Sequence, residues 1–221
     1  MYACLLAFMP RRQKVLQHNK GAAASEIQFD VEGVMGKISV ETCEIEGLKI
    51  ITPEVRGDER GYFMETYQYN DFRAAGIDEV FVQDNQSASK KGVLRGLHFQ
   101  IQYPQAKLVR VIRGEVFDVA VDLRRGSDTF GRWHGVLLSE ENKKQFFVPK
   151  GFAHGFFVLS EYAEFCYKCS DFYHPNDEGG ILYNDPEIGV AWPIPEGTKL
   201  IQSEKDTKWG GLAEYKEKYL R

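Results

Sequence analysis

The chain has 221 residues, enough for one domain with a substantial core, and its 43% hydrophobic and 27% charged content is ordinary for a globular domain. Its net charge of −4, from 28 basic and 32 acidic residues, argues against a general nucleic-acid-binding surface. The apolar opening at residues 2–9 is too short to span a bilayer, and its arginines follow it instead of preceding it as in a signal peptide. Because the four cysteines also form no disulfide framework, we expect a cytoplasmic protein without a membrane segment.

Residues 1–34 differ from the rest of the chain. They contain the stretches RRQK, HNK and GAAAS and show no strand alternation. We interpret them as an N-terminal extension that is poorly ordered or lies upstream of a start at Met35. An arm that packs on a partner is the alternative. Residues 35–221 are interpreted as one domain, because no repeat or change of composition divides them.

From Lys37 onward the pattern predicts mainly β-strands. Short runs of β-branched and aromatic residues follow one another, separated by turn residues. The predicted strands or strand pairs are 48–55, 107–123, 133–139, 144–151, 153–160 and 163–173, with turns at 113–115 and 139–142.

Two short helices interrupt this pattern. The first is predicted over 70–75, with Asn70 as its N-cap and Gly76 after its end, and the second over Leu212–Leu220. Closely spaced strands with few helices are typical of an all-β sandwich, so we predict an antiparallel jelly roll.

The stretch VLRGLHFQ, residues 93–100, carries polar chemistry within a strand pattern. Strict alternation places His98 and Arg95 on opposite faces, but a bulge at Gly96 would let them converge. A lone buried histidine is more often structural than catalytic. Lys107, at the start of another predicted strand, is most simply explained as protection of a sheet edge. These two strands alone therefore assign no function.

Other polar stretches change this interpretation. They are GDERGYFMETY (57–67), FVQDNQS (81–87), VPKGFAHGF (148–156), YAEFCYK (162–168) and SEKD (203–206). VLRGLHFQ and KLVRVIRGEVFDVAVDLR (107–124) lie between FVQDNQS and VPKGFAHGF. The seven motifs, in their order along the chain, resemble those of the dTDP-4-dehydrorhamnose 3,5-epimerases, which are cupin-fold enzymes. The resemblance runs from about Glu46 to Asp206.

The resemblance implies a role for each matching position. His98 falls on the catalytic base, Asp206 on its partner carboxylate, Tyr167 on the acid of the opposite face, and Lys107 on the lysine near the sugar carbonyl. The positions implied to bind substrate are Arg60, Phe63, Glu65, Gln83, Asn85, Arg95, His154, Glu178 and Lys205. The family also implies a cupin-type jelly roll, a dTDP-4-keto-6-deoxy sugar as substrate, a homodimer, and neither a cofactor nor a metal.

These residue types suit inversion beside a ketone. Protons at C3 and C5 of a 4-keto sugar are acidic because the carbanion delocalises as an enolate. Inversion removes a proton from one face and returns one to the other, so it needs a base such as His98 and an acid such as Tyr167 on opposite sides. Lys107 would stabilise the enolate oxygen, and arginines suit a diphosphate. We therefore predict epimerisation at C3 and C5 of dTDP-4-dehydro-6-deoxy-D-glucose, which gives dTDP-4-dehydro-L-rhamnose.

Three positions depart from the family pattern. Gln86 stands where histidine is frequent, Ala106 where glycine is usual, and Phe172 where tyrosine is frequent. None removes a catalytic group, but Phe172 lies near the end that binds the base and puts the nucleobase contact in doubt.

Other functions explain fewer of these residues. Many cupins hold a metal through a His-x-His pair, and here Gln100 replaces the second histidine. Cys166 and Cys169 are three apart on a strand, which places them on opposite faces as packing residues. A C3-only epimerase stays open as an alternative. So does a non-catalytic sugar-nucleotide-binding jelly roll, although it would not need His98, Asp206 and Tyr167 together.

Overall fold

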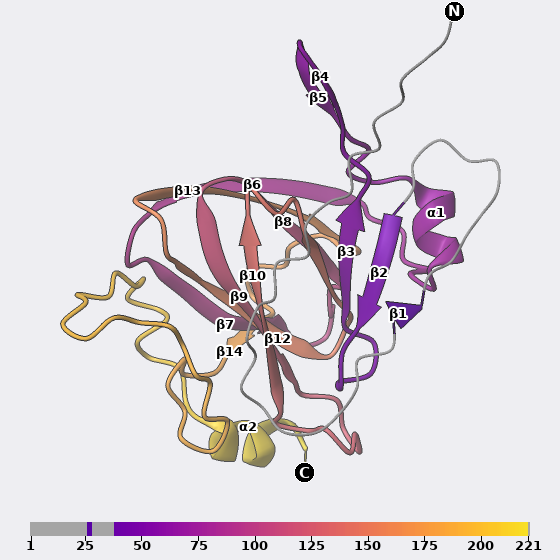
Figure 1. Cartoon of the computed structure of the whole chain (residues 1–221). Coiled ribbons are helices and arrows are strands. Elements are labelled where there is room, and N and C mark those ends of the chain that lie inside the picture. The colour runs from indigo at the N-terminus through magenta and orange to yellow at the C-terminus, as the bar shows by residue number, and fades with distance from the viewer. Residues whose placement is uncertain (1–25, 28–37, 221) are drawn as a thin grey trace, which may run out of the picture.

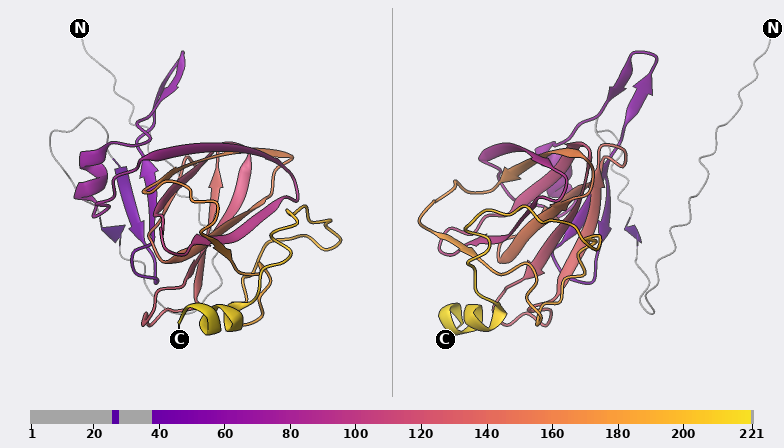
Figure 2. Two further views of the ribbon diagram at one scale, coloured as in Figure 1. Left: turned by 180° about the vertical axis from the view of Figure 1, so that it is seen from behind. Right: turned by 90° about the vertical axis from the view of Figure 1, so that its left-hand side faces the viewer.

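The computed structural model describes residues 26–27 and 38–220, which form two facing antiparallel sheets (Figures 1 and 2). The larger sheet has seven strands in the order β1 (Glu26–Ile27), β2 (Ile38–Thr42), β3 (Lys49–Pro53), β11 (Gln145–Val148), β8 (Lys107–Arg113), β13 (Tyr162–Cys169) and β6 (Gln83–Lys90). The smaller has five, in the order β10 (Trp133–Ser139), β9 (Glu115–Asp122), β12 (Phe152–Val158), β7 (Leu94–Gln100) and β14 (Glu178–Gly180). This is the all-β sandwich that the sequence predicts.

One hairpin and two helices lie outside the two sheets. Strands β4 (Arg56–Asp58) and β5 (Gly61–Phe63) form a hairpin that projects away from the sandwich (Figure 1). Helix α1 (Tyr69–Ala74) lies beside β2, and helix α2 (Leu212–Tyr219) packs against the outer face of the smaller sheet through Leu212. Neither helix of the described segments has the length and hydropathy that a bilayer span requires.

The core between the sheets is built from side chains that alternate along the strands. Val109 and Val111 of β8 and Phe165 of β13 face Phe156 and Val158 of β12, and all five are at most 5% exposed. The rings of Phe156 and Phe165 stack with their centroids 4.3 Å apart. Burial of each such side chain stabilises the fold by roughly 1.5–3 kcal/mol. This apolar packing holds the two sheets at a fixed separation.

The predicted strands are confirmed to within a few residues. The stretch 107–123 forms two strands, β8 in the larger sheet and β9 in the smaller, and the chain turns between them at Gly114 with φ of 77°. The interpretation of 81–87 as a polar cluster missed β6. That strand is polar on both faces and has only one neighbour, β13, so its sequence lacks the apolar alternation of a buried strand.

The first helix is confirmed over nearly the predicted residues, but its predicted N-cap is wrong. Gln68, not Asn70, caps the helix, and its side-chain oxygen accepts hydrogen bonds from the backbone N–H groups of Asn70 and Asp71. The amide of Gln68 is long enough to fold back over the first turn, so the helix begins one residue earlier. Gly76 follows the helix with φ of 74°, as predicted.

The predicted bulge at Gly96 is present. On β7, His98 is paired with His154 of β12 and Arg95 with Phe156, so three residue steps on β7 oppose two on β12. A Cβ on Gly96 would lie 2.5 Å from the Cα of Gly155, and the φ of Gly96 is 121°. Only glycine fits here, and the extra residue turns Arg95 and His98 toward the same cavity.

Part of the predicted N-terminal extension belongs to the larger sheet. The backbone of residues 26–27 pairs with β2, opposite Glu41 and Val40. The remainder of residues 1–34 and the boundary at residue 35 fall outside the described residues.

Asp122 anchors the loop that follows β9. Its buried carboxylate accepts hydrogen bonds from the Arg124 guanidinium (2.7 and 2.9 Å), from Ser127 Oγ (2.7 Å) and from Thr129 Oγ1 (2.6 Å). Burial by itself would raise the pKa of Asp122. The hydrogen bonds from Arg124, Thr129 and Ser127 outweigh it and lower this pKa to about 2.

We expect Asp122→Asn to lower the free energy of unfolding by about 1.5–3 kcal/mol at pH 7. Because the pKa is lower in the folded protein, the charge stabilises the fold above the ordinary carboxyl pKa, and this contribution disappears as the pH falls from about 4 to 2. Urea unfolding of both proteins across this pH range should show the difference narrowing. The same change at the exposed Asp128 should have little effect, and a difference independent of pH would contradict the assignment.

Candidate active site

Three adjoining cavities lie at the end of the sandwich where β7 ends and β8 and β12 begin. The main cavity, of 510 Å³, contains Arg95, His98, Tyr167 and Asp206 in its wall. The Tyr173 cavity, of 250 Å³, is lined by Gln83, Asn85, Tyr173 and Glu178 among others. The α2 cavity, of 480 Å³, extends toward the C-terminal helix. Lys107 lines all three, so they meet at its side chain.

His98 and Asp206 form the shortest contact in the main cavity. The imidazole Nε2 donates to Oδ1 of Asp206 over 2.5 Å. The side chain of His98 is 24% exposed and that of Asp206 only 3%. Burial alone would raise the pKa of Asp206, but the hydrogen bond and charge of His98 outweigh it and lower this pKa. The carboxylate therefore stays ionised and fixes the tautomer of His98, leaving Nδ1 as the nitrogen that can accept a proton.

A second histidine–carboxylate pair lies beside the first. His154 is the cross-strand partner of His98, and its Nε2 donates to both oxygens of Asp118 at 2.9 and 3.0 Å. Asp118 is fully buried; burial raises its pKa, while the nearby His154 and Lys107 act in the opposite direction. The sequence analysis did not assign Asp118 to the site. Asp118 alternates with apolar residues on an inner face of β9, and this pattern alone does not distinguish it from a structural residue.

Tyr167 and Lys107 approach from the larger sheet, opposite His98. Tyr167 lies on β13 next to Val109, and Lys107 begins β8. Burial raises the pKa of the Tyr167 hydroxyl, which keeps it protonated at neutral pH. Burial also lowers the pKa of Lys107, although the nearby Cys169, Asp118 and Glu178 partly offset that effect. Lys107 thus lines the cavities, and its simpler interpretation as edge protection is wrong because β8 lies between β11 and β13 in the sheet.

A network of amides and charges surrounds the Tyr173 cavity. Gln83 donates to Asn85 over 3.0 Å, and Glu178 accepts from Lys205 at 2.6 and 2.7 Å. Lys205 also lines the main cavity, where Arg95 is held by Ser89 through hydrogen bonds of 3.2 and 3.3 Å. The predicted residues Gln83, Asn85, Glu178, Lys205, Arg95 and His154 therefore gather around one connected space.

Tyr173 is a site residue that the sequence analysis missed. Its hydroxyl donates to Glu178 over 3.1 Å, its backbone N–H donates to Gln83, and its ring lines the cavity while remaining 50% exposed. Phe172, where the doubt about a nucleobase contact arose, is 60% exposed and lines none of the three cavities. The aromatic side chain that lines the Tyr173 cavity at this position is therefore Tyr173 and not Phe172.

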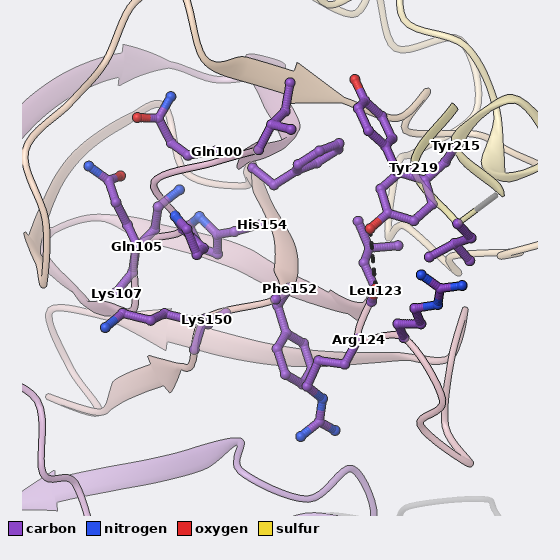
Figure 3. A pocket seen from close by; sticks show the side chains of 17 residues that line it. Gln100, Gln105, Lys107, Leu123, Arg124, Lys150, Phe152, His154, Tyr215 and Tyr219 are labelled. Atoms are coloured by element: carbon purple, nitrogen blue, oxygen red, sulfur yellow. Dashed lines mark hydrogen bonds between the residues drawn. The ribbon is translucent and has the colours of Figure 1, made fainter. Parts of the chain in front are cut away.

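The α2 cavity adjoins the main cavity at Lys107 and His154, which line both (Figure 3). Lys107, His154 and Gln105 lie at one end of it, and Tyr215 and Tyr219 of α2 at the other. None of its lining residues is an aspartate or glutamate.

Three predicted residues do not reach these cavities. Arg60 and Phe63 belong to the projecting hairpin, where Arg60 pairs with Asp58 and the ring of Phe63 is 68% exposed. Glu65 follows the hairpin and lines none of the three cavities.

The described segments contain no group of three or more His, Cys, Asp or Glu residues placed to hold a metal ion. The Gln100 amide donates to the backbone carbonyl of His174 and accepts from its N–H, so it braces a loop. Cys166 and Cys169 are buried free thiols, and burial raises the pKa of each.

The arrangement is suited to proton transfer across a cavity. A histidine with a buried carboxylate partner stands on β7 of one sheet, and a protonated tyrosine stands on β13 of the other. Lys107 and Arg95 supply positive charge between and beside them. A substrate that forms an enolate could be deprotonated on one face and protonated on the other.

Comparisons with known proteins agree with this chemistry. Residues 42–214 match the family model described as dTDP-4-dehydrorhamnose 3,5-epimerase. The chain is 57% identical over 170 residues to the dTDP-4-dehydrorhamnose 3,5-epimerase of Methanothermobacter thermautotrophicus, covering 77% of this chain and 92% of the relative. It is 55% identical over 166 residues to the enzyme of that name from Pseudomonas aeruginosa, covering 75% and 91%. The crystal structure of a dTDP-6-deoxy-D-glucose-3,5-epimerase from Legionella pneumophila, in complex with dTDP-4-keto-L-rhamnose, superposes with a TM-score of 0.78 at 53% identity, covering 80% of this chain and 94% of that one.

Proposed function

The chain belongs to the dTDP-4-dehydrorhamnose 3,5-epimerase family, and we propose that His98, Asp206 and Tyr167 carry out the epimerisation from opposite sides of the main cavity. The protein is an isomerase that converts dTDP-4-dehydro-6-deoxy-D-glucose to dTDP-4-dehydro-L-rhamnose. The cupin-type sandwich of its solved relatives is the fold described above.

Each inversion consists of two proton transfers. His98 takes the proton from the carbon beside the ketone, and the C–H electron pair moves into the carbonyl to give an enolate. The ammonium group of Lys107 stabilises the enolate oxygen. When the enolate collapses to the ketone, Tyr167 gives its hydroxyl proton to the same carbon on the opposite face. Exchange with water then restores the proton of Tyr167 and deprotonates His98, and the sequence repeats at the second carbon.

The observation that carries this assignment is the placement of base and acid on different sheets. His98 and Tyr167 line the same two cavities from β7 and β13, so a sugar ring between them presents one face to each. Asp206, which is 2.5 Å from His98 and almost fully buried, supports the base as it becomes an imidazolium.

The nucleotide is proposed to occupy the Tyr173 cavity. The exposed ring of Tyr173 offers a stacking surface for the base, and Gln83, Asn85 and Glu178 offer hydrogen-bonding groups around it. Arg95 and Lys205 line the adjoining main cavity, where they supply the positive charge that a diphosphate needs.

We also propose that the enzyme is a homodimer in which each hairpin completes the site of the partner subunit. The hairpin projects from the sandwich, and its aromatic side chains Tyr62 and Phe63 are 57% and 68% exposed, which is typical of a surface that packs on another chain. Arg60 and Phe63 would then bind substrate in a neighbouring site. A cytoplasmic location is supported by the three described cysteines, all free thiols.

His98→Ala should abolish deuterium uptake at both C3 and C5 in D₂O while dTDP still binds, because the base is lost and the nucleotide contacts remain. Asp206→Asn should reduce uptake by about 10²–10⁴-fold, since the amide no longer stabilises the imidazolium. NMR of the sugar locates the label. Normal exchange in His98→Ala would refute the base assignment, and exchange confined to C3 in the unmodified enzyme would identify a C3-only epimerase.

Tyr167→Phe should separate exchange from inversion. The variant keeps the ring but has no proton to give, while His98 can still remove a proton and return it to the same face. Deuterium uptake should therefore persist, and formation of inverted sugar should fall by about 10²–10⁴-fold. If both fall together, Tyr167 positions the substrate; if neither falls, the acid is another group.

Mixed dimers test the hairpin. His98→Ala subunits and Arg60→Ala subunits should each be poorly active alone. If each hairpin serves the partner, a mixed dimer holds one site with both His98 and Arg60 intact, so random mixing should restore about a quarter of the wild-type activity. Arg95→Ala in place of Arg60→Ala is the matched control, because Arg95 lies in the same chain's cavity.

In that control, one site of each mixed dimer lacks His98 and the other lacks Arg95, so neither site is intact. No restoration is expected. Equal restoration in both mixtures, or none with Arg60→Ala, would contradict the exchange of hairpins between subunits.

A further inference from the structure

Trp209 lies three residues beyond Asp206, in the loop that brings this carboxylate to the base. Its ring meets the ring of His98 edge to face, with the centroids 6.4 Å apart and the planes at 69°. The indole N–H is buried and has no hydrogen-bond partner among the described residues. The contacts that the structure shows for this ring are therefore packing contacts.

Trp209 also rests on the backbone of Gly180. A Cβ placed on Gly180 would lie 2.5 Å from Cδ2 of Trp209, well inside the distance of 3.0 Å that real Cβ contacts keep. Gly180 of β14 is the cross-strand partner of His98 on β7. The indole thus touches both members of one strand pair, and the pair includes the base.

The loop between β14 and α2 is tied down on both sides of Trp209. The N–H of Asp206 donates to the carbonyl and hydroxyl oxygens of Ser203 at 3.1 and 3.2 Å, which closes a turn before it. After it, the carbonyl of Gly210 accepts from the N–H of Leu182 over 3.0 Å. Between these two anchors, the carboxylate of Asp206 contacts β7 and the indole of Trp209 packs on both β7 and β14.

We propose that Trp209 is a positioning residue for the catalytic base: seated on Gly180 and against the imidazole, it holds Asp206 in register with Nε2 of His98. This inference rests on the proposed role of His98. The 2.5 Å contact between His98 and Asp206 tolerates little displacement, and a shift on the order of 1 Å in a catalytic group costs about 10²-fold in rate.

Trp209→Ala should lower kcat for epimerisation by about 10–100-fold and leave KM and dTDP affinity within about two-fold, because the groups that bind substrate are untouched. Trp209→Phe keeps an aromatic ring on Gly180 and should recover part of the loss.

Gly180→Ala tests the same contact from the other side. The backbone of Gly180 is outside the left-handed region, so the added methyl group meets the indole without backbone strain. This change should lower kcat in the wild type. In Trp209→Ala it should cause no further loss, because the atom it would strike is gone, so the two effects should not add.

Gly179→Ala is the matched control. This neighbouring glycine of β14 faces Phe99, and a Cβ there would lie 2.5 Å from Cε2 of that ring. Its effect on kcat should be equal with and without Trp209. Thermal unfolding of every variant measures any general loss of stability.

A wild-type kcat in Trp209→Ala, a rise in KM with kcat unchanged, or strictly additive effects of the changes at Gly180 and Trp209 would overturn the proposal. If Trp209→Ala does not fold, the effect of Gly180→Ala on kcat is measured in Trp209→Phe and in the wild type instead, and equal effects in the two would overturn the proposal. If His98→Ala abolishes deuterium uptake while the Trp209 variants behave as wild type, the base assignment survives and only the positioning role fails.

Discussion

Ionisable groups buried between two sheets constrain this structure more than any other feature. A carboxylate or imidazolium removed from water is stable only beside a partner, and both buried carboxylates of the site have one. Asp206 and Asp118 are 2% and 0% exposed, and each accepts a hydrogen bond from a histidine. Since these histidines are cross-strand partners on β7 and β12, the two pairs are held side by side by the ladder of the sheet. The same ladder that forms the core therefore fixes the spacing of these two histidine–carboxylate pairs.

The two-residue period of the strands explains how polar chemistry enters an apolar core. On β13 the inner row runs from Phe165 to Tyr167, and on β8 from Val109 to Lys107. In each row the apolar residue packs between the sheets and the polar one, two positions along, faces the cavity. A slip of one residue would turn both toward the outer face. Packing of the apolar residues thus specifies the register in which Tyr167 and Lys107 face His98.

Much of this could be predicted from the sequence, because strand alternation and short motifs are local signals. The strands, the second helix and the bulge at Gly96 follow from such signals, whereas most residues of the cavity were predicted because the motifs resemble a known family. What was missed depends on contacts distant in sequence. Asp118 is an ordinary alternating residue until β12 brings His154 beside it, and β6 becomes recognisable as a strand only through its pairing with β13. Gln68 is the N-cap in place of Asn70 because the conformation of one side chain decides which residue caps a helix. Residue preferences make some residues more frequent at this position but do not determine that conformation.

The site divides its tasks between elements of different rigidity. His98 and Tyr167, the groups proposed to transfer protons, lie on strands with neighbours on both sides, so their separation is set by the packing of two sheets. The groups proposed to bind the nucleotide lie at the margins: Glu178 on the edge strand β14, and Tyr173 in a loop. Proton transfer needs positions fixed to within a fraction of an ångström, whereas a flexible nucleotide can be bound by groups that adjust to it. Asp206 is the exception. It contacts His98, the proposed base, but lies in a loop, and that loop is therefore the part of the site that most needs a rigid side chain packed against the sheet.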